Sequence, residues 1–377
     1  MDYALFTFDK EQWNEPLNIA LDSTQTFIFF VSNQLSEEID RPILTLREAF
    51  PNATIIGIST FASIINDEIN SKNFYALVIK FEHTPLRLIC KNTLDTDMFT
   101  LGGALVEELK EDDLAHIFLC TASVALNNTV LAYACNSTKK PVSISGGVAS
   151  ARNKQTSWIY ANNRFSHTSV VGIGFYGKHI QFGLGHATGL ERLGLTRRVT
   201  RAKGREIFEL DGRAALSLYK KYLNTDKEIL EYRDFIFPIA ILDSEGGIAK
   251  IRSVFSYNAE QGSIIINDDI SSNTYISFMT ANFNKLTQGA YDAAQESAQY
   301  YQDSQKVVAL TISCTGRYSM MSEHIEEELF SVKEGLPEDC LSVGFYSDGE
   351  INAKAHQNCT LRNQTMTLSL IWELEDA

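Results

Sequence analysis

Two stretches of the sequence, one near each end, are versions of the same pattern. Residues 341–350 read Leu-Ser-Val-Gly-Phe-Tyr-Ser-Asp-Gly-Glu, and residues 54–63 read Thr-Ile-Ile-Gly-Ile-Ser-Thr-Phe-Ala-Ser. In both, an apolar strand reaches a glycine (Gly57 or Gly344) and enters a corner rich in hydroxyl groups. A repeated sequence pattern indicates a repeated structural unit, and two copies are too few for a solenoid. The chain is therefore predicted to consist of two pseudo-repeated halves.

The segments around the two copies match as well. Each copy is preceded by an apolar run and an amphipathic segment and is followed by an alternating strand, at 26–31, 42–50 and 75–82 and again at 307–312, 323–332 and 366–373. Strand-like segments outnumber helical ones, which favours an α+β fold with mixed or antiparallel sheets covered by helices. The charged stretch 224–234 is the expected junction, so domains are predicted at 1–225 and 226–377.

Length, charge and cysteine usage exclude several classes of protein. A chain of 377 residues exceeds the size at which one hydrophobic core stops growing. Its 47 acidic and 33 basic residues leave a net charge of −14, which repels nucleic acid. No apolar run approaches the roughly 20 residues that span a bilayer, and no signal peptide is recognisable. Because the six cysteines are scattered, we expect a cytoplasmic protein with reduced thiols and no membrane insertion.

Several motifs resemble those of the FIST family over nearly the whole chain. Val-Thr-Arg-Ala-Lys-Gly at 199–204 and Glu-Leu-Asp-Gly at 209–212 are similar to the end of the FIST N-terminal domain. Cys-Thr-Gly-Arg at 314–317, the segment 344–351 and Asn-Gln-Thr at 363–365 are similar to the FIST C-terminal domain. The resemblance implies an intracellular sensory module that binds a small ligand and reports to a signalling partner. No motif of an output domain is found, so we expect the signal to pass to a separate protein.

The resemblance also implies a cofactor. Free-standing FIST proteins of this length resemble bacterial haem-binding nitric-oxide sensors that act on a partner histidine kinase. A haem needs an axial ligand, and His186 lies among small residues in Phe-Gly-Leu-Gly-His-Ala (182–187), where a flat macrocycle could approach. His186 is therefore the predicted iron ligand, with an ordinary surface or core imidazole as the alternative.

Arg317, Tyr346 and Glu350 complete the predicted binding site. Arg317 follows Gly316 at the end of a buried strand, where its guanidinium could clamp a ligand carboxylate or a haem propionate; the alternative is a structural ion pair with Glu350. Tyr346 offers a hydroxyl donor at the corner, although corner hydroxyls also cap turns. A second hypothesis is a binder of an amino acid or another small organic metabolite through Arg317 and Glu350.

An enzymatic role is the minor alternative. Cys314, beside Gly316 and Arg317, is the one plausible nucleophile, and it would need a lowered thiol pKa. No recognisable base, oxyanion motif, Gly-x-Ser-x-Gly, Walker or His-Glu-x-x-His string accompanies it. We therefore predict a sensor that is not an enzyme, with a cryptic hydrolase as the remaining enzymatic hypothesis.

Overall fold

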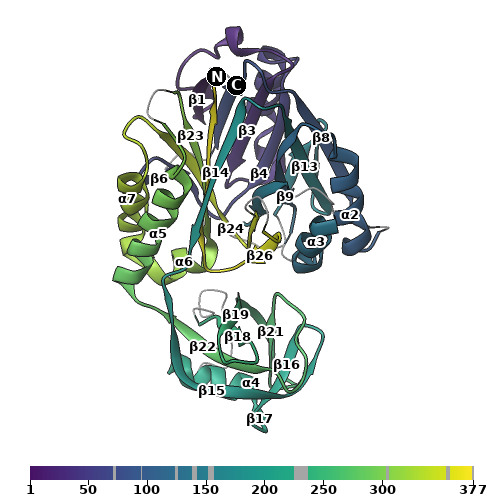
Figure 1. Ribbon diagram of the computed structural model, residues 1–377, viewed down its shortest axis with the longest axis vertical. Coiled ribbons are helices and arrows are strands. Elements are labelled where there is room, and N and C mark those ends of the chain that lie inside the picture. The colour runs from purple at the N-terminus through teal and green to yellow at the C-terminus, as the bar shows by residue number, and fades with distance from the viewer. Residues whose placement is uncertain are drawn as a thin grey trace.

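The structure is a computed structural model that describes residues 1–70, 74–94, 96–123, 126–137, 142–151, 157–224, 237–302, 305–353 and 357–375. Figure 1 shows a large body, which holds both chain ends, and a smaller lobe below it. The body contains three sheets with helices packed on their outer sides, and the lobe is formed by the chain between residues 188 and 281. The α+β class predicted from the sequence is confirmed.

The first sheet has the strand order β12-β11-β4-β3-β7-β1-β2. Its strands are β1 (Asp2–Asp9), β2 (Gln12–Trp13), β3 (Thr26–Ser32), β4 (Thr54–Ser59), β7 (Phe74–Lys80), β11 (Ile159–Ala161) and β12 (Arg164–Ser166). Strands β3 and β4 are parallel and joined through helix α1 (Asp40–Ala49), while β7 lies antiparallel on the other side of β3.

The second sheet has the order β26-β25-β10-β9-β13-β8 and the third has the order β14-β27-β23-β24-β5-β6. The second comprises β8 (Leu86–Asn92), β9 (Leu114–Thr121), β10 (Ser143–Val148), β13 (Ser169–Tyr176), β25 (Glu350–Ala353) and β26 (Thr360–Arg362), with helices α2 (Met98–Leu109) and α3 (Asn128–Ala134). The third comprises β5 (Ser63–Ile65), β6 (Glu68–Ile69), β14 (Ile180–Ala187), β23 (Val308–Cys314), β24 (Leu341–Ser347) and β27 (Met366–Glu373), with helices α5 (Phe283–Ala298), α6 (Thr315–Met321) and α7 (Ile325–Gly335).

The three sheets share one topology, so the repeat predicted from the sequence is present in three copies rather than two. In each sheet a parallel pair (β3/β4, β9/β10 or β23/β24) is flanked by an antiparallel return strand (β7, β13 or β27). The hairpin that follows each pair joins a neighbouring sheet: β5–β6 pairs with β24, β25–β26 with β10, and β11–β12 with β4. This cyclic exchange gives the body pseudo-threefold symmetry.

The glycine of the repeat is needed where the two parallel strands meet. Gly146 lies opposite Leu119, and Gly344 opposite Thr311. A Cβ atom at Gly146 would lie 1.8 Å from the Leu119 carbonyl oxygen, and one at Gly344 would lie 1.7 Å from the Thr311 oxygen. These neighbours are backbone atoms that cannot move aside, so the position accepts no side chain.

One central core is enclosed by the inner faces of the three sheets. Phe29 on β3 contacts Phe118 on β9 with a centroid distance of 5.4 Å and Phe345 on β24 with a distance of 5.8 Å. The three rings come from three different sheets, and all belong to the same buried cluster. Separate clusters lie under α1, under α2 and α3, and under α5 and α7.

The lobe is a separate sheet with its own core. Its order is β19-β18-β22-β15-β16-β21-β20, and β17 also pairs with β16. The elements are β15 (Leu190–Lys203), β16 (Glu206–Leu210), β17 (Arg213–Ala214), α4 (Ala215–Leu223), β18 (Ile239–Leu242), β19 (Ile248–Arg252), β20 (Val254–Asn258), β21 (Ser263–Ile266) and β22 (Tyr275–Ala281).

The predicted boundary at 225/226 falls at residues outside the described ranges. Strands on both sides of it, β15–β16 and β18–β22, pair with one another and share one hydrophobic cluster. The described residues form the body and a lobe that is inserted between β14 and α5. Among the described residues, no helix is long and apolar enough to cross a membrane.

Candidate functional site

Buried polar atoms without a hydrogen-bond partner are concentrated on hairpin β25–β26 and the turn after it. Of sixteen such side-chain atoms in the described part of the chain, seven belong to Glu350, Asn352, Arg362, Asn363 and Gln364. Leaving a buried polar group unpaired costs about 1–3 kcal/mol. So many unpaired groups in one short segment point to a partner that is not part of the polypeptide.

The strand register places two of these residues inside the body. Glu350 pairs with Gly147, which lies beside Cys120, and Asn352 pairs with Ser145, which lies beside Phe118. Paired residues of neighbouring strands share a face of the sheet, and Cys120 and Phe118 belong to the central core. Glu350 and Asn352, both 0% exposed, therefore lie on the inner face of the second sheet.

The pseudo-threefold symmetry provides an internal comparison for these two positions. In each copy, the residue that follows the repeat glycine pairs with a residue of a neighbouring hairpin. These three hairpin residues are Glu350 on β25, Ile159 on β11 and Ser63 on β5. Two residues further along these strands are Asn352, Ala161 and Ile65. Ile159 and Ala161 are part of the central core, and Ile65 packs against it. The fold thus accepts apolar residues at sites where the third copy holds a carboxyl and a carboxamide.

Glu350 is held as a carboxylic acid at neutral pH. Its Oε2 accepts hydrogen bonds from the Thr365 amide at 3.2 Å and from Thr365 Oγ1 at 2.6 Å, whereas Oε1 has no partner. Among the described residues, no basic side chain forms an ion pair with it. Burial raises the pKa of Glu350 to about 8, and the Thr365 hydrogen bonds offset this only in part.

Arg362 lies opposite Glu350 on the neighbouring strand of the hairpin. Its side chain is partly buried, and its Nε atom has no hydrogen-bond partner. Sequence reasoning missed Asn352 and Arg362. A position-by-position comparison of the two recognised copies would have shown Glu350 and Asn352 where the first copy has Ser63 and Ile65.

Arg317 is a structural hub, and its ionic partner is Glu328 rather than Glu350. The fully buried guanidinium approaches Glu328 Oε1 with Nε at 2.7 Å and Nη2 at 2.6 Å. It also donates to the carbonyl oxygens of Leu286, at 2.9 Å, and of Thr188. Thr188 precedes the lobe and Leu286 follows it, so Arg317 contacts both chain segments that connect the body to the lobe. These contacts leave no side of its guanidinium available to bind a ligand carboxylate.

Tyr346 lies on the opposite side of its sheet from the polar hairpin. It packs in a cluster with Ile64, Met321 and Leu329, and its ring meets that of Tyr318 at 5.0 Å. Burial raises the pKa of Tyr346 well above its ordinary value, and its hydroxyl has no hydrogen-bond partner. The structure therefore does not bring Tyr346 and Glu350 into one site.

The other corner hydroxyls join the sheets. Ser347 Oγ donates to the carbonyl oxygens of Val148 at 2.9 Å and Gly349 at 2.7 Å. Thr60 Oγ1 is equivalent to it in the first copy and bonds the Ala62 and Tyr346 carbonyl oxygens at 2.7 and 2.9 Å. These hydroxyls satisfy backbone groups at the points where a strand passes to the next sheet.

The glycines beside His186 are explained by helix packing. A Cβ atom at Gly183 or Gly185 would lie 1.8 Å from a carbonyl oxygen of helix α5, so these glycines allow the helix to pack against β14. Haem ligation by His186 stays a prediction. The His186 amide donates to Glu296 Oε2 at 3.0 Å, and its Nδ1 lies 3.9 Å from the same oxygen.

Among the described histidines, His116 is the most deeply buried, and both of its ring nitrogens have partners. Its Nδ1 and Nε2 lie 2.7 Å from Ser143 Oγ and 2.9 Å from Ser145 Oγ, and its ring stacks on Phe182 at 3.7 Å. Burial lowers the pKa of His116 to about 3, so it is neutral. Within the described residues, no group of three or more His, Cys, Asp and Glu side chains could hold a metal ion. His356 lies outside those residues.

Cys314 is buried beside Glu350. Burial, and secondarily the nearby Glu350 carboxyl, raises the pKa of the Cys314 thiol well above its ordinary value. A neutral thiol is a weak nucleophile, so the chemistry that a thiol-dependent hydrolase needs is disfavoured at this position.

The polar hairpin also contacts the lobe, and Figure 1 shows β26 directly above lobe strands β18 and β19. Gln364 Nε2 donates to Ser253 Oγ at 3.1 Å, and Arg252 Nη1 donates to the Leu361 carbonyl oxygen at 3.2 Å. The site residues therefore lie where the body meets the lobe.

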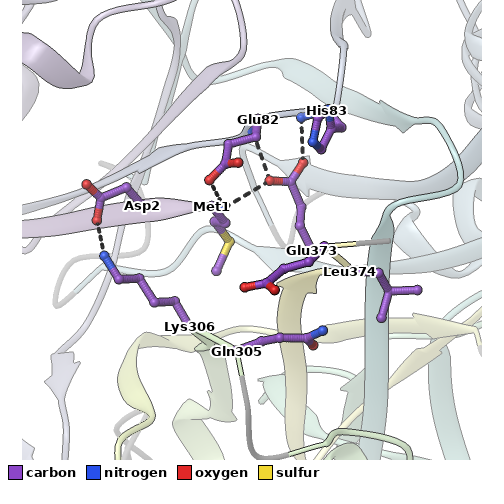
Figure 2. Close-up of a pocket in the computed structure, with 9 residues that line it drawn as sticks. Met1, Asp2, Glu82, His83, Gln305, Lys306, Glu373 and Leu374 are labelled. Carbon is purple, nitrogen blue, oxygen red and sulfur yellow. Dashed lines mark hydrogen bonds and ion pairs between the residues drawn. The ribbon is translucent and has the colours of Figure 1, made fainter. Parts of the chain in front are cut away.

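A separate pocket of about 550 Å³ lies at the other end of the body (Figure 2). Both cations of its lining, the Met1 amine and Lys306, form ion pairs with carboxylates of the same lining. The Met1 amine lies 2.8 Å from Glu82, and Lys306 lies 2.8 Å from Asp2. Glu373 accepts hydrogen bonds from the amides of Glu82 and His83 at 2.8 and 3.0 Å. Because these partners are internal, the hairpin is the stronger candidate for a ligand site.

Comparison with known proteins agrees with this architecture. The uncharacterized protein MJ1623 of Methanocaldococcus jannaschii is 23% identical over 224 residues. That match covers 52% of this chain and 42% of the length of MJ1623. Residues 25–213 match the FIST N domain and residues 215–353 match the FIST C domain. The chain therefore belongs to the FIST family, whose domains are signal-transduction sensors that bind small ligands.

Proposed function

We propose that this chain senses a small polar ligand at hairpin β25–β26 and passes the signal to a separate protein in the cytoplasm. The observation that carries the proposal is the buried pair Glu350 and Asn352, whose free polar atoms occupy positions that are apolar or hydroxylic in the other two copies. An unpaired carboxamide and carboxyl reduce stability by about 1–3 kcal/mol each. A ligand that supplies their hydrogen bonds would offset this cost. All six cysteines are free thiols, in accord with a reducing compartment.

The contacts between hairpin and lobe support transmission of the signal. A ligand bound to Asn352 contacts β25, which pairs with β26. Strand β26 in turn accepts the Arg252 hydrogen bond from the lobe at the Leu361 carbonyl. A shift of the hairpin on ligand binding therefore changes the orientation of the lobe relative to the body. The reoriented lobe presents a different surface to a partner protein.

A thermal-shift screen of small polar metabolites tests this proposal. We expect at least one compound to raise the melting temperature of the wild type and to leave that of Asn352→Leu unchanged, because the variant lacks the carboxamide. Asn284→Leu, on the exposed face of α5, is the matched control and should respond as the wild type does. If every stabilising compound acts equally on wild type and Asn352→Leu, the ligand site lies elsewhere.

The finer hypothesis of a haem-based nitric-oxide sensor that regulates a histidine kinase rests on the family resemblance. An absorption spectrum of the purified protein decides it. A Soret band that nitric oxide shifts and that His186→Ala abolishes would support haem ligation by His186. Protein that stays colourless after reconstitution with haem would exclude it.

A further inference from the structure

Arg362 is partly buried and, unlike the two buried arginines of the described residues, forms no ion pair with another described residue. Arg252 lies 2.9 Å from Asp268, and Arg317 pairs with Glu328. The Nε of Arg362 is shielded from solvent and has no hydrogen-bond partner among the described residues, and Glu296 and Glu350 act on its charge without forming an ion pair with it. A shielded N–H donor without a partner is costly. An anion at this position would remove the cost.

The groups around Arg362 add to the local positive charge. Arg252 lies close enough to lower the pKa of Arg362, although burial is the larger cause. Across the lobe interface, Lys250 and Arg252 share one carboxylate, Asp268, at 3.1 and 2.9 Å. On the other side, Glu296 approaches from α5 and is partly exposed. Three cations thus face two carboxylates, and Glu350 adds no charge while it is protonated. The local excess is positive in a chain whose net charge is −14.

We propose that Arg362 binds an oxyanion group of the ligand, a carboxylate or a phosphate, while Asn352 and Glu350 bind its neighbouring polar atoms. This inference rests on the proposed function and names the chemical class of its ligand. The guanidinium Nε–H and the Asn352 amide N–H are donors, and an oxyanion has acceptors for both. A cationic ligand would lie beside an unpaired guanidinium. A neutral amide would leave the charge of Arg362 uncompensated.

Isothermal titration with three small probes tests the assignment. Acetate and acetamide have the same shape and differ in charge, and inorganic phosphate distinguishes the two oxyanion sources. We expect the wild type to bind acetate or phosphate and to bind acetamide at least about tenfold more weakly, as loss of a charged hydrogen bond requires. The probe that binds more tightly identifies the source as a carboxylate or a phosphate.

Variants of Arg362 separate this inference from the proposed function. Arg362→Gln should weaken anion binding at least about tenfold, and Arg362→Lys should retain part of it. Arg41→Gln, which changes an exposed arginine on α1, is the control and should bind as the wild type does. Circular dichroism establishes that each variant is folded.

Two results would overturn the anion assignment. The first is a lack of charge selectivity at Arg362: acetamide binds as tightly as acetate, or Arg362→Gln leaves anion binding unchanged. The other is that neither anion binds at up to ~10 mM, a range that includes weak fragment affinities. In either case the proposed function still stands if a neutral metabolite stabilises the wild type and not Asn352→Leu. If no metabolite distinguishes those two proteins, the proposed function fails as well.

Discussion

Replacement of Glu350 by glutamine is expected to stabilise the protein at alkaline pH and to have little effect at acidic pH. The carboxyl of Glu350 has an ordinary pKa of 4.5, and burial raises that pKa to about 8 in the folded protein. Between these values the folded state holds one proton more than the unfolded state. The free energy of unfolding therefore falls by about 1.4 kcal/mol for each pH unit over this interval. At pH 7 the accumulated loss is about 3 kcal/mol.

Glutamine has the shape of the protonated acid and no charge at any pH. Its amide oxygen can accept the two hydrogen bonds that Thr365 donates to Glu350 Oε2. Cys314, Arg317 and Arg362 face this position, and none of them is altered by the substitution. The difference in unfolding free energy between Glu350→Gln and wild type should accordingly be near zero at pH 4.5 and grow to about 3–5 kcal/mol at pH 8.

Urea unfolding followed by circular dichroism at several pH values measures this difference. An equal slope of unfolding free energy against urea concentration shows that both proteins expose the same surface on unfolding. Curves for the two proteins that stay parallel from pH 4.5 to 8 would refute the reasoning, because Glu350 would then titrate alike in the folded and unfolded states. Glu326→Gln, on the exposed face of α7, is the control and should give parallel curves.

Four further outcomes are expected. Asn352→Leu should raise the free energy of unfolding by about 1–3 kcal/mol, measured by urea titration, because it removes an unpaired buried amide; a loss of stability would show that a protein group pairs with the amide. Arg317→Met should lower it by about 3–5 kcal/mol, since Glu328 would be left buried without a counter-ion, and Glu328→Gln in the same chain should recover part of the loss. Gly344→Ala should give a chain that expresses in insoluble form or melts far below wild type, whereas Gly349→Ala, whose new Cβ atom would meet the movable end of Leu361 at 2.9 Å, should be milder. Acetate binding should weaken above about pH 8 in the wild type, because ionised Glu350 repels an anion, and Glu350→Gln should remove this dependence; a dependence that persists in the variant would assign it to another group.

The elements of the repeat could be predicted because their patterns are strong. Strands β3 and β23 are apolar on both faces, as strands at the centre of a covered sheet must be, and both were expected within one or two residues of their observed bounds. The middle copy, which contains β9 and β10, was missed because its corner reads Gly-Gly-Val-Ala at 146–149, without the hydroxyl groups that made the other two recognisable. The topology is preserved there by backbone geometry, which tolerates the change of side chains.

The site was predictable only in part. Glu350 could be chosen from the sequence as an acidic residue at the end of a repeated strand, but its partner could not, because Arg317 forms its ion pair with Glu328 on helix α7. The glycines beside His186 were ambiguous in the sequence for a similar reason. A glycine on a strand indicates that something approaches closely, and whether that is a ligand or a helix depends on tertiary packing, here the packing of α5.

The body departs from its pseudo-threefold symmetry in two ways, and the two meet at one place. The third unit alone carries an inserted lobe, between β14 and α5, and its hairpin alone places a carboxyl and a carboxamide in the central core. Arg252 of the lobe bonds Leu361 of the hairpin, and Ser253 bonds Gln364, although the members of these pairs are 109 and 111 residues apart along the chain. The stability of a pseudo-symmetric body does not require that two departures from its symmetry lie at the same contact. Both departures are therefore what the proposed ligand site, and its proposed coupling to the lobe, require.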